Sequence, residues 1–135
     1  MPNFWSGVMD KQFYVISVMH TLRKHLYMTI WRPDNKGYCW ALSNAGKYDR
    51  KQVMGELGYY NSGCSNVAVP CAVLDRIAVV SKPGHLDNNT GPVVPNNRAV
   101  WQLVLKNLIA PVPYQPKPEY NGARRQKGCD VFYEA

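Results

Sequence analysis

The sequence contains no long apolar run. None of its segments approaches the ~20 consecutive apolar residues that a membrane-spanning helix requires. Residues 1–7 also lack the basic region and the apolar core of a secretory signal peptide. We therefore expect a cytoplasmic protein with no membrane partner, in which the four cysteines are reduced thiols: Cys39, Cys64, Cys71 and Cys129.

Motifs that identify enzymes and metal sites are also missing. Zinc sites show closely spaced Cys and His pairs, whereas six residues separate Cys64 from Cys71 and four separate His20 from His25. No G-x-G-x-x-G or Walker pattern is present to hold a phosphate group. A cysteine–histidine pair remains conceivable for nucleophilic catalysis, but no local signature supports one. We therefore expect no catalytic residue, metal or cofactor, and hence no enzyme.

Acidic residues are few relative to basic ones. Nine Asp and Glu stand against 16 Lys and Arg, which gives a formal net charge of +7 and an isoelectric point near 9.3. Such a charge favours anionic partners: nucleic acid, nucleotides or an acidic protein surface. It is also common on small domains, where it serves solubility alone. The 135 residues fit one domain, and 46% hydrophobic residues is a typical globular value.

Three segments near the N-terminus predict β-strands. Residues 13–19 are rich in β-branched and aromatic side chains, although their apolar positions also fit helical spacing. Residues 26–31 and 38–42 predict two further strands, joined by a tight turn. Together the three segments predict a small antiparallel meander.

The turn between the second and third strands permits two registers. Asp at the first position and Gly37 at the fourth suit a type I turn, which would place Asp34 opposite Tyr38. Trp40 would then lie inside and Trp31 would be more available. If Asp34 and Asn35 form a two-residue loop instead, Trp40 joins Trp31, Tyr27 and Tyr38 on one face. Turn chemistry favours the first register.

Capping residues predict three helices. Asp49, with Gln52 three residues on, predicts a helix to about residue 57 that stops at Gly58, followed by a loop over 59–63. Residues 66–69 form a short extended run, and Pro70 suits the first turn of a helix through about residue 77. Asn97 predicts a cap for a helix over 98–109, in which the apolar stripe makes Trp101 a core residue.

The chain is expected to contain one α+β domain over residues 1–110. A small antiparallel sheet, the N-terminal meander, would be packed by two or three short helices. Residues 81–97 are expected to form a long loop. Residues 111–135 predict a Pro-rich, basic C-terminal extension, packed on the domain or trailing from it, in which 131–133 could form an edge strand.

Several motifs resemble those of a group of proteins. Residues 31–40 (WRPDNxGYxW), 45–48 (AGKY), 59–61 (YYN) and 67–71 (VAVPC) are similar to segments of small uncharacterised bacteriophage and prophage accessory proteins. The similarity covers about a third of the chain and excludes the 81–97 loop and the tail. It implies expression in the cytoplasm of a bacterial host and roles such as inhibition of host defence, with no established active site.

Aromatic rings and cations concentrate around the predicted hairpin. Aromatic faces stack on bases, and Arg or Lys meets phosphate. We therefore expect a ligand-binding site with stacking rings, phosphate-binding cations, and polar groups for ribose or base edges. Its residues would be Trp31, Tyr59 and Tyr60; Arg32, Lys36 and Lys47; and Asp34 and Asn61.

The leading hypothesis is a phage counter-defence protein that binds and sequesters a small anionic, nucleotide-like ligand without catalysis. One alternative is a protein-level inhibitor of a host nucleic-acid-binding defence complex, comparable to anti-CRISPR proteins, in which the same rings form interface hot spots. Another is direct binding of DNA or RNA. A homo-oligomer is compatible with each hypothesis.

Overall fold

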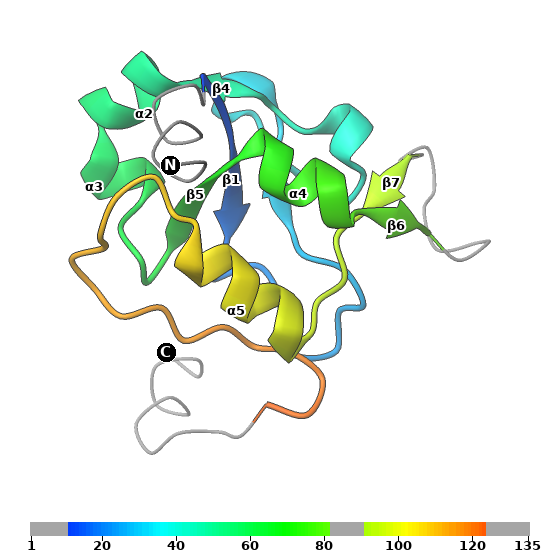
Figure 1. Ribbon diagram of the computed structural model, residues 1–135. Helices are drawn as coiled ribbons and strands as arrows, with labels where there is room; N and C mark the ends of the chain where they lie inside the picture. The colour runs from blue at the N-terminus through cyan, green and yellow to red at the C-terminus, as the bar shows by residue number, and fades with distance from the viewer. Residues whose placement is uncertain (1–10, 82–90, 124–135) are drawn as a thin grey trace, which may run out of the picture.

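The structure is a computed structural model that describes residues 11–81 and 91–123 (Figure 1). It confirms an α+β fold with a small antiparallel sheet; the described residues contain four helices rather than two or three. The strands are β1 (Gln12–Ser17), β2 (Ile30–Trp31), β3 (Tyr38–Cys39), β4 (Tyr48–Asp49), β5 (Asn66–Pro70), β6 (Val79–Val80) and β7 (Pro92–Val93). The helices are α2 (Arg50–Gly55), α3 (Leu57–Tyr60), α4 (Cys71–Ile77) and α5 (Arg98–Lys106), with 3-10 turns at Pro33–Asn35 and Leu42–Asn44.

Strand β1 lies at the centre of the main sheet. β5 pairs antiparallel with β1 from Phe13 to Ser17. On the opposite edge, β4 pairs with the start of β1 at Phe13, and β2 pairs with its end at Ile16. β3 then extends the sheet beyond β2. The predicted strand over 13–19 is therefore confirmed up to Ser17, while residues 18 and 19 lie beyond its end, and the extended run over 66–69 belongs to its longest partner.

The two faces of the sheet bury different side chains because residues alternate along each strand. Tyr14 and Ile16 point into the larger core, which α4 and α5 cover (Figure 1). There they meet Trp101 of α5, which is 1% exposed, as predicted. Phe13 and Val15 point to the other face and pack with residues from β4, α2, α3 and β5: Tyr48, Val53, Tyr60 and Ala68.

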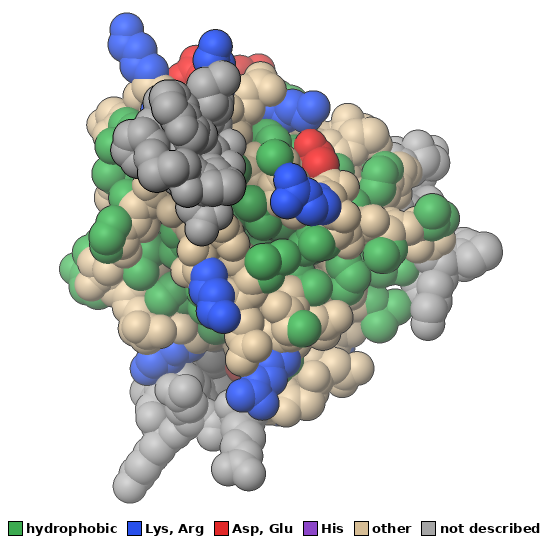
Figure 2. All heavy atoms as spheres, in the orientation of Figure 1, with side chains coloured by type: hydrophobic (Ala, Val, Ile, Leu, Met, Phe, Trp, Pro, Cys, Tyr) green, Lys and Arg blue, Asp and Glu red, His purple; other side chains and the backbone are tan. Residues whose placement is uncertain are grey.

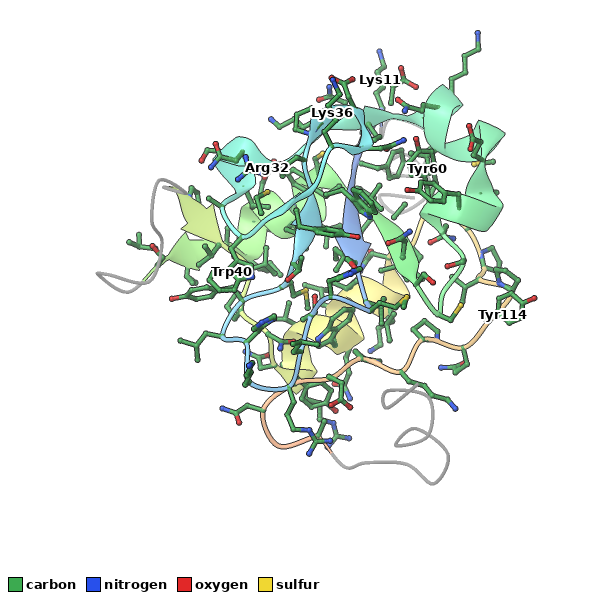
Figure 3. The ribbon with its side chains drawn as sticks, turned by 180° about the vertical axis from the view of Figure 1, so that it is seen from behind. Lys11, Arg32, Lys36, Trp40, Tyr60 and Tyr114 are labelled. Carbon is green, nitrogen blue, oxygen red and sulfur yellow. The ribbon has the colours of Figure 1, made fainter. Side chains whose placement is uncertain are left out.

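This second face is covered unevenly. Helices α2 and α3 pack over the part that holds Phe13 and Val15, and the Tyr59 ring of α3 extends beyond it to Trp31. Farther along, the β2–β3 hairpin has no described helix over it when the protein is seen from behind (Figure 3). The buried residues on that part of the face are polar: Ser17, Thr29 and Asn66. One side of the hairpin is therefore open to solvent.

The hairpin adopts the alternative register rather than the favoured one. Trp31 is paired with Tyr38, so the two side chains lie on the same face. Asp34 and Asn35 both have positive φ, 59° and 57°, and the N–H of Lys36 donates to the carbonyl of Pro33. These angles fit a type I′ turn, which matches the twist of a two-residue hairpin. The expectation that Trp40 lies inside was wrong: Trp40 is half-buried on the face of Trp31.

The helix starts were predicted better than the helix ends. Asp49 caps α2 by accepting from the N–H of Gln52, and Asn97 caps α5 by accepting from that of Val100. However, α2 ends at Gly55, and α3 replaces the start of the loop expected over residues 59–63. α5 ends at Lys106 rather than at residue 109. Within the expected 81–97 loop, β7 pairs with β6.

The part of the C-terminal extension that is described packs on the domain. The N–H of Tyr114 donates to the carbonyl of Ser62, and Arg23 forms an ion pair with Glu119 at 3.2 Å. Gly63 has a φ of +97°, and a Cβ there would lie 1.8 Å from the carbonyl oxygen of Tyr114. Glycine is therefore needed where the extension crosses the loop before β5. The predicted edge strand over 131–133 lies outside the described residues.

Asn61 connects the segment just before this extension to the sheet. The Nδ2 of its side chain donates to the backbone carbonyl of Ala110, and the side-chain oxygen Oδ1 accepts from the N–H of Ala68 in β5. The N–H of Ile109 donates to the carbonyl of Ala68, so the outer edge of β5 is paired at this point. An edge strand satisfied in this way offers fewer free groups for aggregation.

We predict that Asn61→Ala lowers the free energy of unfolding by about 1–3 kcal/mol, because two buried groups lose their partner. Asn61 is only 1% exposed. Urea unfolding followed by circular dichroism measures the change. Asn121→Ala, at an exposed position, is the matched control and should unfold with the wild-type midpoint. Equal midpoints for all three proteins would contradict this structural role.

Candidate functional site

Four aromatic rings lie side by side, each in contact with the next, on the part of the second sheet face that carries the β2–β3 hairpin. The ring centroids of His20 and Tyr38 are 4.4 Å apart, those of Tyr38 and Trp31 are 4.5 Å apart, and those of Trp31 and Tyr59 are 6.3 Å apart. His20 and Tyr59 are exposed, whereas Tyr38 and Trp31 are half-buried. We call these residues, His20, Tyr38, Trp31 and Tyr59, the aromatic row. A flat ligand could stack on such a surface.

Asn66 holds two members of the aromatic row in place. Its side-chain oxygen accepts from the indole Nε1–H of Trp31 at 2.9 Å. Its amide nitrogen donates to the backbone carbonyl of Tyr59 at 3.0 Å. Asn66 is the first residue of β5 and is itself buried. One side chain on the sheet thus fixes a ring from the hairpin relative to the backbone of α3.

The other two rings are held by β1 and by the hairpin. The N–H of His20 donates to the hydroxyl of Ser17, and the His20 Nδ1 lies 2.9 Å from the same oxygen. The Arg32 Nε–H donates to the carbonyl of Tyr38. Partial burial, aided by nearby Tyr59, raises the pKa of Tyr38, so its hydroxyl stays protonated at neutral pH. The row therefore offers the neutral phenol group of Tyr38 beside its apolar rings.

A second group of rings adjoins the hairpin. Trp40 makes edge contacts with His25 and Tyr27, at centroid distances of 5.5 and 6.0 Å. Its Nε1–H donates to the hydroxyl of Thr29, whose own hydroxyl donates to the carbonyl of His20. Exposed apolar side chains stand in the same β1–β2 connection: Met19, Leu22 and Leu26.

The structure brings together only part of the residue set predicted from sequence. Trp31 and Tyr59 belong to the aromatic row. Tyr60 and Asn61 are buried; the Tyr60 hydroxyl bonds to the Asn35 side-chain oxygen, and Asn61 ties β5 to Ala110. Their predicted contact with a surface ligand does not fit these positions. The cause is α3, which turns this segment into the domain where a loop was expected.

The predicted charged residues gather around the hairpin turn. Asp34, Lys36 and Lys47 are exposed there. Arg32 is half-buried and acts on the covered side of the hairpin, where it counteracts part of the pKa rise of the buried Cys39. Its guanidinium group also bonds to the backbone of Tyr38. Arg32 therefore braces the hairpin, whereas the two lysines remain accessible.

The cysteines and the possible metal ligands of the described residues are scattered. Among residues 11–81 and 91–123, no three His, Cys, Asp or Glu side chains gather as a metal site would require. Cys39, Cys64 and Cys71 form no disulfide among the described residues, and Cys129 lies outside them. Burial raises the pKa of the Cys39 thiol to about 11, which keeps it protonated and weakly nucleophilic.

Comparison with known proteins leaves this site to be interpreted from its own residues. No protein-family model matches the chain, and neither the curated proteins nor the solved structures include a significant match. In the part of the chain that is described, no helix combines the length and apolarity needed to cross a membrane.

Sequence reasoning did not include His20, Tyr38 and Trp40 in the predicted site. The signal that would have found Tyr38 and Trp40 is the Asp34-Asn35 pair, since both residue types tolerate positive φ and thus a type I′ turn. That turn sets the register that brings Tyr38 and Trp40 to the face of Trp31. No comparable local signal marks His20, which joins the row through its bonds to Ser17.

The environment of His25 predicts a loss of stability in acid. Burial, aided by the charge of Lys24, lowers the pKa of His25, and its Nδ1 accepts from the N–H of Leu22. The unfolded chain then binds a proton more readily than the folded chain, so stability should fall as pH drops through about 6.5, the ordinary value for histidine. Urea midpoints between about pH 7.5 and 5.5 span that value and measure the fall. His25→Gln should show a smaller fall, and an identical pH profile would contradict the assignment.

Proposed function

We propose that this protein binds a small anionic, nucleotide-like ligand on the aromatic row, without chemical conversion of the ligand. The observation that carries the proposal is the set of four rings in contact beside the β2–β3 hairpin, which has no described helix over it. Hydrogen bonds hold the side chains of Trp31 and His20 and the backbone of Tyr38 and Tyr59. Exposed rings held in advance lose little conformational entropy when a ligand stacks on them.

The roles of the residues follow from their positions. Trp31 and Tyr59 provide ring faces for a base, and the Tyr38 hydroxyl provides a neutral hydrogen-bond donor. Lys36 and Lys47 provide positive charge for phosphate at the turn end of the hairpin. Asp34, exposed in the turn, can accept hydrogen bonds from ribose hydroxyls.

The biological context of this proposal comes from the resemblance to phage and prophage accessory proteins. Such a protein, acting in the cytoplasm of a bacterial host, would sequester a signalling nucleotide of the host defence. Sequestration needs tight binding and no turnover, which suits a rigid stacking surface. Calorimetry against cyclic nucleotides and ADP-ribose derivatives tests the proposal, and failure of all of them to bind would contradict it.

A protein partner is the second candidate, and one observation favours it. Met19, Leu22 and Leu26 are each between 40% and 45% exposed in the β1–β2 connection, whose His25 contacts Trp40. Apolar and aromatic side chains of this kind form the centres of protein interfaces. If this protein binds no nucleotide but retains one partner protein in a stable, stoichiometric complex, the result would favour a protein-level inhibitor.

We predict that Tyr59→Ala weakens nucleotide binding about tenfold or more, because a stacked base contributes about 1–3 kcal/mol. Tyr114→Ala is the matched control, since Tyr114 is 63% exposed, against 42% for Tyr59, and lies apart from the site (Figure 3). Calorimetric titration of both variants measures the affinities. Equal losses in the two variants would contradict stacking on the aromatic row.

A further inference from the structure

Three basic segments meet at one end of the sheet. The N–H of Arg50 donates to the carbonyl of Lys11, which precedes β1. β4, which pairs with the start of β1, brings the segment from Lys47 to Lys51 to the same end. The hairpin turn joins them because the Tyr48 hydroxyl donates to the carbonyl of Arg32 and accepts from the N–H of Asn35. Figure 3 shows Lys11 and Lys36 together at this end.

We call this group the basic end; its residues are Lys11, Lys36, Lys47, Arg50 and Lys51. The four lysines are exposed, and the guanidinium carbon of Arg50 lies 5.1 Å from the centre of the Phe13 ring. Two acidic residues, Asp34 and Asp49, belong to the same segments. The Asp49 carboxylate accepts from the N–H of Gln52 as the cap of α2. Positive charge therefore dominates this end.

Basic side chains are dispersed on the face formed by α4 and α5. Over α4 and α5 they stand apart from one another between apolar and polar side chains (Figure 2). The basic end thus differs from the face above these helices in the grouping of its charges. A grouped set of cations attracts a partner that carries several negative charges, since each contact with a phosphate releases counterions.

The basic end adjoins the aromatic row. The Tyr48 ring, which lies under the hairpin turn, is 5.4 Å from that of Tyr60, and the Tyr60 ring is 5.0 Å from that of Tyr59. Both Tyr48 and Tyr60 are buried, so these contacts place the two regions next to each other but form no surface themselves. At the surface the hairpin joins them, because Lys36 stands in its turn and Trp31 is paired with Tyr38 in its strands.

We propose that the basic end and the aromatic row form one binding path for single-stranded nucleic acid. Phosphates would lie along the lysines of the basic end, and successive bases would stack on Tyr59, Trp31 and Tyr38. This inference rests on the proposed function and extends it, because the nucleotide on the row then belongs to a chain with further phosphates.

Single strands fit this path better than duplexes. Stacking on Trp31 and Tyr59 requires bases with free faces, which single strands provide and paired helices do not. The row lies on a sheet, and sheets with exposed rings are used in this way to bind unpaired bases. Sequence preference should be weak, since every base has a face that can stack.

Fluorescence anisotropy tests the inference with a labelled strand of about eight nucleotides, within the range that one single-strand-binding domain covers. We expect tighter binding than for a mononucleotide, and an affinity that falls steeply with salt. The variant Lys47→Gln/Lys51→Gln should bind the strand about tenfold more weakly and reduce the salt slope by about 1.4, since each lost contact removes about 0.7. Binding of a mononucleotide should change less.

Arg98→Gln/Lys106→Gln is the matched control. This variant also removes two positive charges, but from α5, a helix over the covered face of the sheet. It should leave binding of the strand nearly unchanged. Equal weakening by both double variants would overturn the path, because charge alone would then explain the affinity. Tighter binding of a duplex of the same length would overturn it too.

The mononucleotide separates this inference from the proposed function. If a mononucleotide and the strand bind equally well, the extended path is wrong and the small-ligand proposal stands. If neither binds, both proposals fail. Binding of the strand that is insensitive to Tyr59→Ala would overturn the role of the aromatic row in the path.

Discussion

The left-handed backbone at Asp34 and Asn35 is the constraint on which the surface of this protein depends. Positive φ at both residues gives the hairpin a two-residue turn and sets Trp31 opposite Tyr38. In a strand, a shift of one residue exchanges every side chain between the two faces. A type I turn in this place would have moved Trp40 into the core and away from the face of Trp31. The aromatic row thus exists because two residues that tolerate left-handed geometry stand together.

The rest of the domain supports this hairpin through β1. Strand β1 pairs with β5 along one edge and with β4 and β2 along the other, so one central strand positions every segment that contributes to the site. Apolar side chains fill the covered face under α4 and α5. On the opposite face the residues change from Phe13 and Val15 to Ser17, and the covering helices stop at the same point. Along β1, the change from apolar to polar side chains therefore coincides with the end of the helical cover.

Local signals in the sequence predicted what depends on local chemistry. The caps at Asp49 and Asn97, the strand over 13–19 and the buried Trp101 follow from capping, β propensity and helical spacing, and they are confirmed. The burial of Asn61 and Tyr60 depends on α3 and on the C-terminal extension, whose contacts join residues about 50 positions apart. His20 likewise reaches Tyr38 only through tertiary packing. Spacing along the chain carries no information about such contacts.

Hydrogen bonds from a buried asparagine distinguish the aromatic row from rings that are exposed by chance. Exposed aromatic rings are common on proteins and need no explanation when they stand singly. Here a buried asparagine satisfies the indole N–H of Trp31 and the backbone carbonyl of Tyr59, and it orients both. A buried polar side chain requires hydrogen-bond partners, and an apolar residue at the start of β5 would have avoided that requirement. With Asn66 at this place, the Trp31 side chain and the backbone of Tyr59 have fixed positions although the Tyr59 side chain is exposed. An exposed ring beside a fixed one is suited to a flat ligand, because the surface does not have to reorganise when one arrives.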